Sequence, residues 1–189
     1  MKVRIASLLI IPTIILHTTV FARLQVGSSA PDFSLKDEKG TVYSLAALKG
    51  KKVALVFYPR PNTPGCTKQV CSLRDKFADL NDAGITVLGI SNGSEDTMNG
   101  FKATNKLSFP LLQADDNVLK KYGTKGGLTN LYLPKRYTFL VNEQGILVAI
   151  IKDVDVDDHA EQIVQGFAKS GQPSSKKAPN AKRSAKKSS

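Results

Sequence analysis

Two cysteines, Cys66 and Cys71, are the only thiols of this 189-residue chain. They lie in the stretch FYPRPNTPGCTKQVCSLRD (residues 57–75), between an apolar run and an amphipathic segment. Proline is tolerated in the first turn of a helix, and the pattern predicts one helix from Pro64 to Asp82. In that helix the two cysteine Cα atoms would be roughly 8.7 Å apart, whereas a disulfide needs less than about 7 Å. The spacing favours a thiol pair that alternates between two conformations, with a static structural disulfide as the alternative.

Cys66 lies on the apolar face of this predicted helix, which should pack against a sheet, whereas Cys71 is turned about 140° away from it. The apolar face consists of Cys66, Val70, Leu73, Phe77 and Leu80. Unpaired N–H groups and the helix dipole favour a thiolate in the first turn. Thr63 is placed to hydrogen-bond the sulfur or a bound oxygen. Arg136, at the start of a later strand, is the candidate for a nearby cation, because an inward arginine there requires a partner.

Other chemistries lack the residues that they need. A zinc site takes about four ligands, and the only histidines are His17 and His159. A Cys–His hydrolase would need His159 as its base, but we interpret that residue as a surface or packing histidine on the last helix. The spacing also differs from the C-x-x-C of thioredoxin chemistry. We therefore expect no metal and no organic cofactor.

The elements that must position the cysteines follow an α/β order. Apolar runs predict strands over 51–59, 84–91 and 109–113, and a hairpin over 136–151 with its turn at residues 143–145. A short strand followed by a helical turn is predicted over 42–48. Further helices are predicted over 94–106, 117–123 and 157–171. This order predicts an α/β domain with a mixed central sheet flanked by helices, with parallel crossovers first and an antiparallel edge last. It is consistent with a thioredoxin-like fold, although periodicity alone does not fix the topology.

The two ends of the chain differ from the domain, which we assign to residues 23–171. Residues 1–22 have the pattern of a secretory signal peptide, with Lys2 and Arg4 before an apolar run and a cleavage site after Ala22. An uncleaved membrane anchor is the alternative. A cleaved signal predicts a secretory route to the periplasm or the extracellular space.

The C-terminal residues 172–189 carry six basic residues and no acidic one. Together with residues 1–22 they account for most of the net charge of +11. This segment has no large apolar residue and is expected to be disordered. We interpret it as a solubilising tail, with binding to nucleic acid or an anionic surface as the alternative.

The chain resembles the peroxiredoxins, in the bacterioferritin-comigratory-protein or PrxQ branch. The matching features are the P-x3-T-x2-C signature at Pro59, Thr63 and Cys66, the second cysteine at Cys71, APDFSL at 30–35 and RYTFLVNEQG at 136–145. The resemblance covers about residues 25–170. One departure is Gln69, which stands where this branch commonly has glutamate.

The resemblance implies a thioredoxin-dependent peroxiredoxin that reduces hydrogen peroxide and organic hydroperoxides. It makes Cys66 the peroxidatic and Cys71 the resolving cysteine, joined in a disulfide that a thioredoxin-like dithiol recycles. Thr63 and Arg136 would bind the peroxide, and Pro59 would shield the pocket. We expect a monomer. For an algal host a plastid compartment is a further alternative, ranked below the periplasm and the extracellular space. The alternatives are a thiol–disulfide oxidoreductase or redox sensor on the same fold, and an interaction protein that uses the basic tail.

Overall fold

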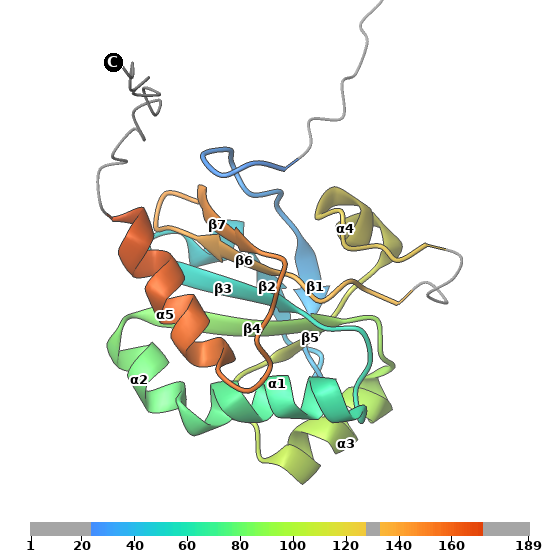
Figure 1. The fold of residues 1–189 in the computed structure, drawn as a ribbon. Helices are drawn as coiled ribbons and strands as arrows, with labels where there is room; N and C mark the ends of the chain where they lie inside the picture. Colours follow the sequence, from blue (N-terminus) through green and yellow to red (C-terminus); the bar gives the residue numbers. More distant parts are fainter. Residues whose placement is uncertain (1–23, 128–132, 172–189) are drawn as a thin grey trace, which may run out of the picture.

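A five-stranded mixed sheet forms the centre of the computed structural model, which describes residues 24–127 and 133–171 (Figure 1). Across the sheet the strands are β5 (Leu111–Gln113), β4 (Ile85–Ser91), β3 (Lys52–Phe57), β6 (Thr138–Val141) and β7 (Leu147–Ile151). The first three are parallel, and β6 and β7 are antiparallel to their neighbours. The predicted mixed sheet with an antiparallel edge is confirmed.

The central strands are buried on both faces, which explains their continuous apolar sequences. β3 pairs with β4 over its whole length, with Leu55 opposite Leu88. β3 ends at Phe57, and the chain then turns over residues 58–63 into a helix. This turn therefore lies at the carboxyl ends of the parallel strands, where α/β proteins commonly place their functional sites.

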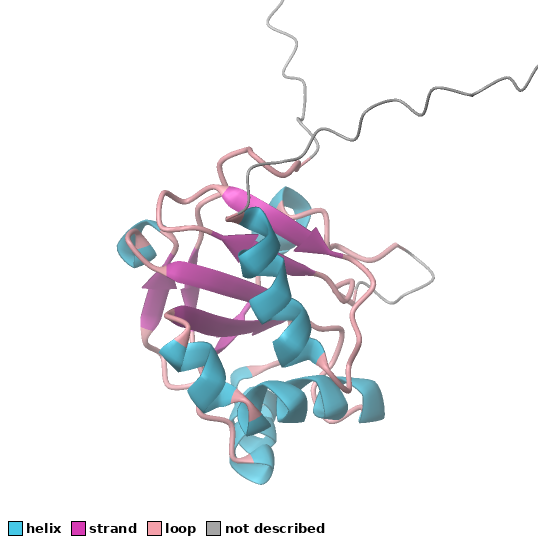
Figure 2. Ribbon diagram, turned by 60° about the vertical axis from the view of Figure 1, so that its left-hand side comes forward, coloured by secondary structure: helices cyan, strands magenta, loops and turns pink. Residues whose placement is uncertain are grey.

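Helices and a small hairpin cover the two faces of the sheet (Figures 1 and 2). One face packs against four helices: α1 (Pro64–Asp75), α2 (Phe77–Asp82), α3 (Glu95–Asn105) and α5 (His159–Ser170). The other face packs against α4 (Asp116–Lys121), the hairpin of β1 (Ser34–Lys36) and β2 (Val42–Ser44), and the 3-10 helix η1 (Ala46–Leu48). Each face thus has its own apolar cluster.

The helix predicted from Pro64 to Asp82 is interrupted at Lys76. This residue has φ −110° and ψ 18°, outside the helical range, so α1 ends before it and α2 begins after it. The predicted apolar face survives the break, because Leu73 and Leu80 are both fully buried. The prediction of one continuous helix was therefore wrong. No glycine or proline lies at Lys76 that could have indicated the interruption from the sequence.

The hairpin turn predicted at residues 143–145 is present between β6 and β7. Gly145 has φ 80°, a conformation that glycine adopts readily. The Asn142 side-chain oxygen accepts hydrogen bonds from the backbone N–H groups of Gln144 and Ile146. The ends assigned to 1–22 and 172–189 lie outside the described residues. Within residues 24–127 and 133–171, no helix is both long and apolar enough to span a membrane.

Candidate active site

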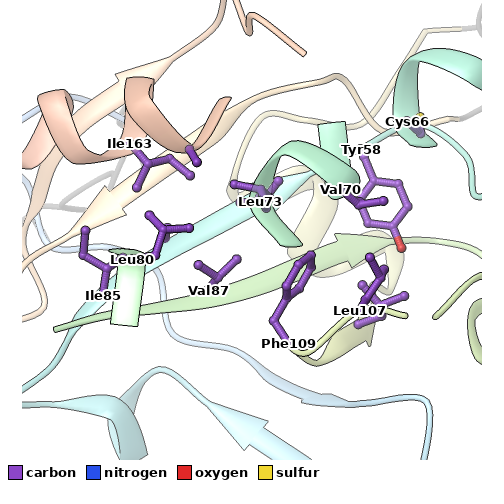
Figure 3. Close-up of a cluster of buried hydrophobic side chains, with 14 of the residues drawn as sticks. Tyr58, Cys66, Val70, Leu73, Leu80, Ile85, Val87, Leu107, Phe109 and Ile163 are labelled. Atoms are coloured by element: carbon purple, nitrogen blue, oxygen red, sulfur yellow. The ribbon is translucent and has the colours of Figure 1, made fainter. Parts of the chain in front are cut away.

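Cys66 lies in the first turn of α1 and is 1% exposed. Thr63 is the N-cap residue and Pro64 begins the helix. The N–H groups of the first turn, which lack partners within the helix, therefore lie at the same end of α1 as the sulfur. Figure 3 shows Cys66 at the margin of the apolar cluster, beside Tyr58 and Val70. The thiol is therefore held at a fixed place between the helix N-terminus and the core.

Arg136 supplies the cation that the sequence predicted beside Cys66. Its Nη2 atom donates a hydrogen bond to the Cys66 sulfur at 3.3 Å. Its Nη1 atom donates to the Gly65 carbonyl oxygen at 3.3 Å and to the side-chain oxygen of Gln69. Arg136 lies two residues before β6. The guanidinium is thus tied to α1 by three acceptors, one of which is the sulfur.

Gln69 belongs to this arrangement, although the sequence indicated it only as a departure from the family pattern. Its side chain is fully buried and lies three residues after Cys66, on the same side of α1. Its Oε1 atom accepts from Arg136, while its Nε2 atom has no partner among the described residues. The sequence shows only that Gln69 lies three residues after Cys66 on the same side of the helix, which does not identify Arg136 as its partner.

Cys71 has a different environment on the same helix. It is half-buried, and its thiol donates to the Asn105 side-chain oxygen at 3.7 Å. Arg74 donates to the Asn105 carbonyl at 2.9 Å. A hydrogen bond from the Arg74 guanidinium to Asp75, with the neighbouring Cys71 as a smaller cause, raises the pKa of Arg74. Both cysteines are free thiols inside α1, as the spacing argument requires of an intact helix.

The comparisons with known proteins agree with this geometry. Residues 26–150 match the AhpC/TSA family. The chain is 42% identical over 146 residues to a putative peroxiredoxin bcp of Coxiella burnetii, covering 75% of this chain and 97% of the relative. It is 40% identical over 130 residues to the chloroplastic Peroxiredoxin Q of Sedum lineare, covering 68% and 69%. The chain belongs to the peroxiredoxins of the AhpC/TSA family.

A solved structure supports the same assignment. The bacterioferritin comigratory protein of Xanthomonas campestris superposes with a TM-score of 0.67 at 26% identity, covering 73% of this chain and 92% of that protein. The thioredoxin-like fold and the bacterioferritin-comigratory-protein or PrxQ branch are confirmed. This peroxiredoxin is a thiol-dependent peroxidase, and a peroxide substrate with a thioredoxin-like reductant is typical of its family.

Two further residues of the family signature lie around the peroxiredoxin's cysteine. The Thr63 hydroxyl donates to the Arg60 carbonyl at 3.0 Å, so its proton is not directed at the Cys66 sulfur. Its oxygen retains lone pairs that can accept a hydrogen bond. Pro59 is half-buried in the turn between β3 and α1. Thr63 and Pro59 are therefore close to the site in sequence and fold, and their catalytic roles remain predictions.

A buried tyrosine lies next to the cysteine. The Tyr58 hydroxyl is fully buried and has no hydrogen-bond partner among the described residues. Burial, with the charge of Cys66 as a smaller cause, raises the pKa of this hydroxyl well above its usual value. Tyr58 is therefore uncharged and belongs to the buried cluster that packs beside Cys66.

His159 is a packing histidine rather than a base. It is fully buried, and one ring nitrogen lies 3.0 Å from the Thr138 hydroxyl. Burial lowers its pKa to about 4, against a smaller opposing effect of the hydrogen bond with Gln162. No group of three or more His, Cys, Asp or Glu side chains suited to a metal ion occurs in the described part of the chain.

Proposed function

We propose that Cys66 is the peroxidatic cysteine and reduces hydrogen peroxide and organic hydroperoxides. The observation that carries the proposal is the 3.3 Å contact between the Arg136 guanidinium and the Cys66 sulfur. A neighbouring cation and a helix N-terminus favour the thiolate, which is the nucleophilic form of cysteine. The bacterioferritin comigratory protein of Xanthomonas campestris has alkyl peroxide reduction activity, and this supports organic hydroperoxides as substrates here.

In the first step the Cys66 thiolate attacks the terminal oxygen of the peroxide. An S–O bond forms while the O–O bond breaks, leaving Cys66 as a sulfenic acid. The leaving oxygen departs with the electron pair and takes up a proton to give water or an alcohol. In this proposal Arg136 and the N–H groups of the first turn stabilise the developing negative charge.

Thr63 and Pro59 complete the pocket in this proposal. Because the Thr63 hydroxyl proton is already donated to Arg60, its oxygen is suited to accept the O–H of the incoming hydroperoxide. Arg136 would then donate to the same peroxide from the other side. Pro59 has no N–H group and would help exclude water from the thiolate.

Cys71 is proposed as the resolving cysteine. Its thiolate attacks the sulfenic sulfur of Cys66, an S–S bond forms, and the sulfenic oxygen leaves as water after taking up a proton. The two Cα atoms are roughly 8.7 Å apart in a regular helix and must come within about 7 Å. The first turns of α1 must therefore unwind during each cycle. A thioredoxin-like dithiol then reduces the disulfide by exchange.

Stopped-flow measurement of peroxide consumption tests these roles. Cys66→Ser is expected to reduce consumption to the uncatalysed rate. Cys71→Ser should retain one rapid turnover and accumulate sulfenic acid, which dimedone labelling detects. Normal peroxide reactivity without Cys66 would overturn the assignment. Rapid dithiol exchange with slow peroxide reduction in the unmodified chain would favour a thiol–disulfide oxidoreductase.

Amide hydrogen exchange tests the unwinding. The oxidised protein is expected to lose protection at residues 64–73 relative to the reduced protein. Equal protection in both forms would contradict resolution by Cys71 through local unwinding of α1.

We propose that residues 1–22 are a targeting segment and that residues 172–189 are a solubilising tail on a monomeric domain. The residue pattern supports a secretory signal, whereas the chloroplastic name of the Sedum relative favours a plastid address. Fusion of residues 1–22 to a reporter, followed by fractionation, distinguishes the two. Sedimentation with and without residues 172–189 checks the monomer and any binding of DNA by the tail.

A further inference from the structure

A cavity lies on the face of the sheet opposite Cys66. Its volume is about 670 Å³, which falls within the roughly 300–1,000 Å³ of small-molecule sites. It is bounded by residues of α4, of β6, β7 and the segment leading into them, and by Leu24 at the start of the described chain. This volume suits a single small molecule rather than a macromolecule.

The sheet separates this cavity from the peroxide site. Arg136 and Tyr137 are consecutive residues leading into β6, and successive side chains of an extended chain point to opposite sides. Arg136 reaches Cys66, which belongs to the cluster beneath α1 and α5. Tyr137 packs against the cluster beneath α4 and lines the cavity. The cavity is therefore not an extension of the peroxide pocket.

The lining of the cavity is strongly basic. Four lysines line it and no acidic residue does: Lys120, Lys121, Lys135 and Lys152. None of the four forms an ion pair with a described acidic residue. The segments outside the described residues contain no aspartate or glutamate, so no acidic side chain from those segments can neutralise the cluster.

Two of these lysines converge on one aromatic ring. The Nζ atoms of Lys135 and Lys152 each lie 5.9 Å from the centre of the Tyr137 ring. Both ammonium groups therefore lie close to the same ring, and an anion bound beside that ring would be attracted by both. Beside them the wall is apolar, with Leu24 and Ile150.

We propose that this cavity binds an amphiphilic organic anion, with its acidic headgroup near the Tyr137 ring in reach of Lys135 and Lys152 and its apolar body against Leu24 and Ile150. This inference goes beyond the peroxidase function, because the ligand is neither the peroxide nor the reductant. A carboxylate and a phosphate monoester share the required headgroup chemistry. The apolar wall distinguishes both of them from an inorganic anion.

Titration of the full ¹⁵N-labelled chain with decanoate, followed by NMR, tests the proposal. Saturable shifts are expected at residues of β6, β7 and α4, with weaker binding as salt is added. Decyl phosphate tests the alternative headgroup, and binding of either compound supports the proposal. Decanol and inorganic phosphate should each bind at least roughly tenfold more weakly, since each lacks one half of the interaction.

A matched pair of double variants makes the test specific. Lys135→Gln/Lys152→Gln should weaken decanoate binding roughly tenfold. Lys49→Gln/Lys169→Gln removes the same charge from exposed lysines outside the cavity and should leave binding unchanged. Circular dichroism verifies that both fold. Equal loss in the two pairs, equal binding of decanol, or no saturable binding of either amphiphile would overturn the proposal.

Discussion

The two cysteines share one helix, yet their surroundings differ in almost every respect. Cys66 is buried, faces the core and is contacted by a guanidinium that is itself tied to Gly65 and Gln69. Cys71 is half-buried and its hydrogen bond to Asn105 is long, while the neighbouring Arg74 guanidinium is bound mainly to other groups. A fixed environment suits a thiol beside which charge develops in the transition state, whereas a thiol in the proposed resolving role must be able to leave its position.

The largest expected difference between the two regions comes from their arginines. Arg136→Met should slow the reaction of the reduced protein with hydrogen peroxide by about 10²–10³-fold, because it removes a donor from the developing charge. Stopped-flow kinetics measures this step. Arg74→Met, the matched change beside Cys71, should leave that step unchanged and alter only the later formation of the disulfide. A similar loss of the first step in both variants would mean that the two regions are not functionally distinct.

A smaller effect is expected from Gln69, which positions Arg136. Gln69→Met removes the acceptor and should slow the peroxide step roughly tenfold, the cost of one charge-assisted hydrogen bond. Gln69→Glu keeps an acceptor and should restore most of the rate. The rate of Cys66 alkylation by iodoacetamide gives a second readout that does not depend on peroxide. Equal rates for Gln69→Met and the wild-type chain would remove Gln69 from the site.

The backbone next to Cys66 provides a finer test. A methyl group on Gly65 would lie 3.3 Å from Arg136 Nη2, closer than is comfortable, so Gly65→Ala should shift the guanidinium by a few tenths of an ångström. We expect about a threefold slower peroxide step, since catalytic rates depend steeply on such placement. Gly100→Ala in α3 meets no atom within 4 Å and serves as the control, with no change in rate.

The smallest effect is expected at Tyr58. Tyr58→Phe removes a buried hydroxyl that lacks a partner among the described residues, so the free energy of unfolding should rise by up to about 1 kcal/mol, with peroxide kinetics unchanged. The control is Tyr122→Phe, which loses a hydrogen bond to the Pro31 carbonyl at 2.6 Å. This control should lose about 1 kcal/mol. Urea unfolding measures both, and a slower peroxide step in Tyr58→Phe would add this residue to the active site.

Local patterns were enough to predict the strands of the central sheet, the apolar face of α1 and the position of Cys66, because each depends on periodicity over a few residues. The short strand β1 was not predicted. The contact between Arg136 and Cys66 was predicted because an inward arginine requires a partner, and the hydrogen bond confirms their proximity. The catalytic roles of Arg136, Thr63 and Pro59 stay predictions.

Other features depend on contacts that no local pattern encodes. Gln69 meets Arg136 only because β6 lies beside α1 in the folded chain. The Thr63 hydroxyl was expected near the sulfur, but the turn directs its proton to Arg60. The lysine-lined cavity is formed by residues of α4, of the β6–β7 hairpin and by Leu24. These segments are separated in the sequence. Tertiary structure alone brings these groups together.

The non-helical residue Lys76 has a consequence for the cost of each catalytic cycle. A helix that is continuous in its hydrogen bonds tends to unfold as one cooperative unit. With the interruption after Asp75, the opening that we propose to bring Cys66 to Cys71 can remain confined to the twelve residues of α1. Leu80, fully buried in α2, can then keep its packing against the core throughout the cycle. The break thus limits how much native structure must be rebuilt after each turnover.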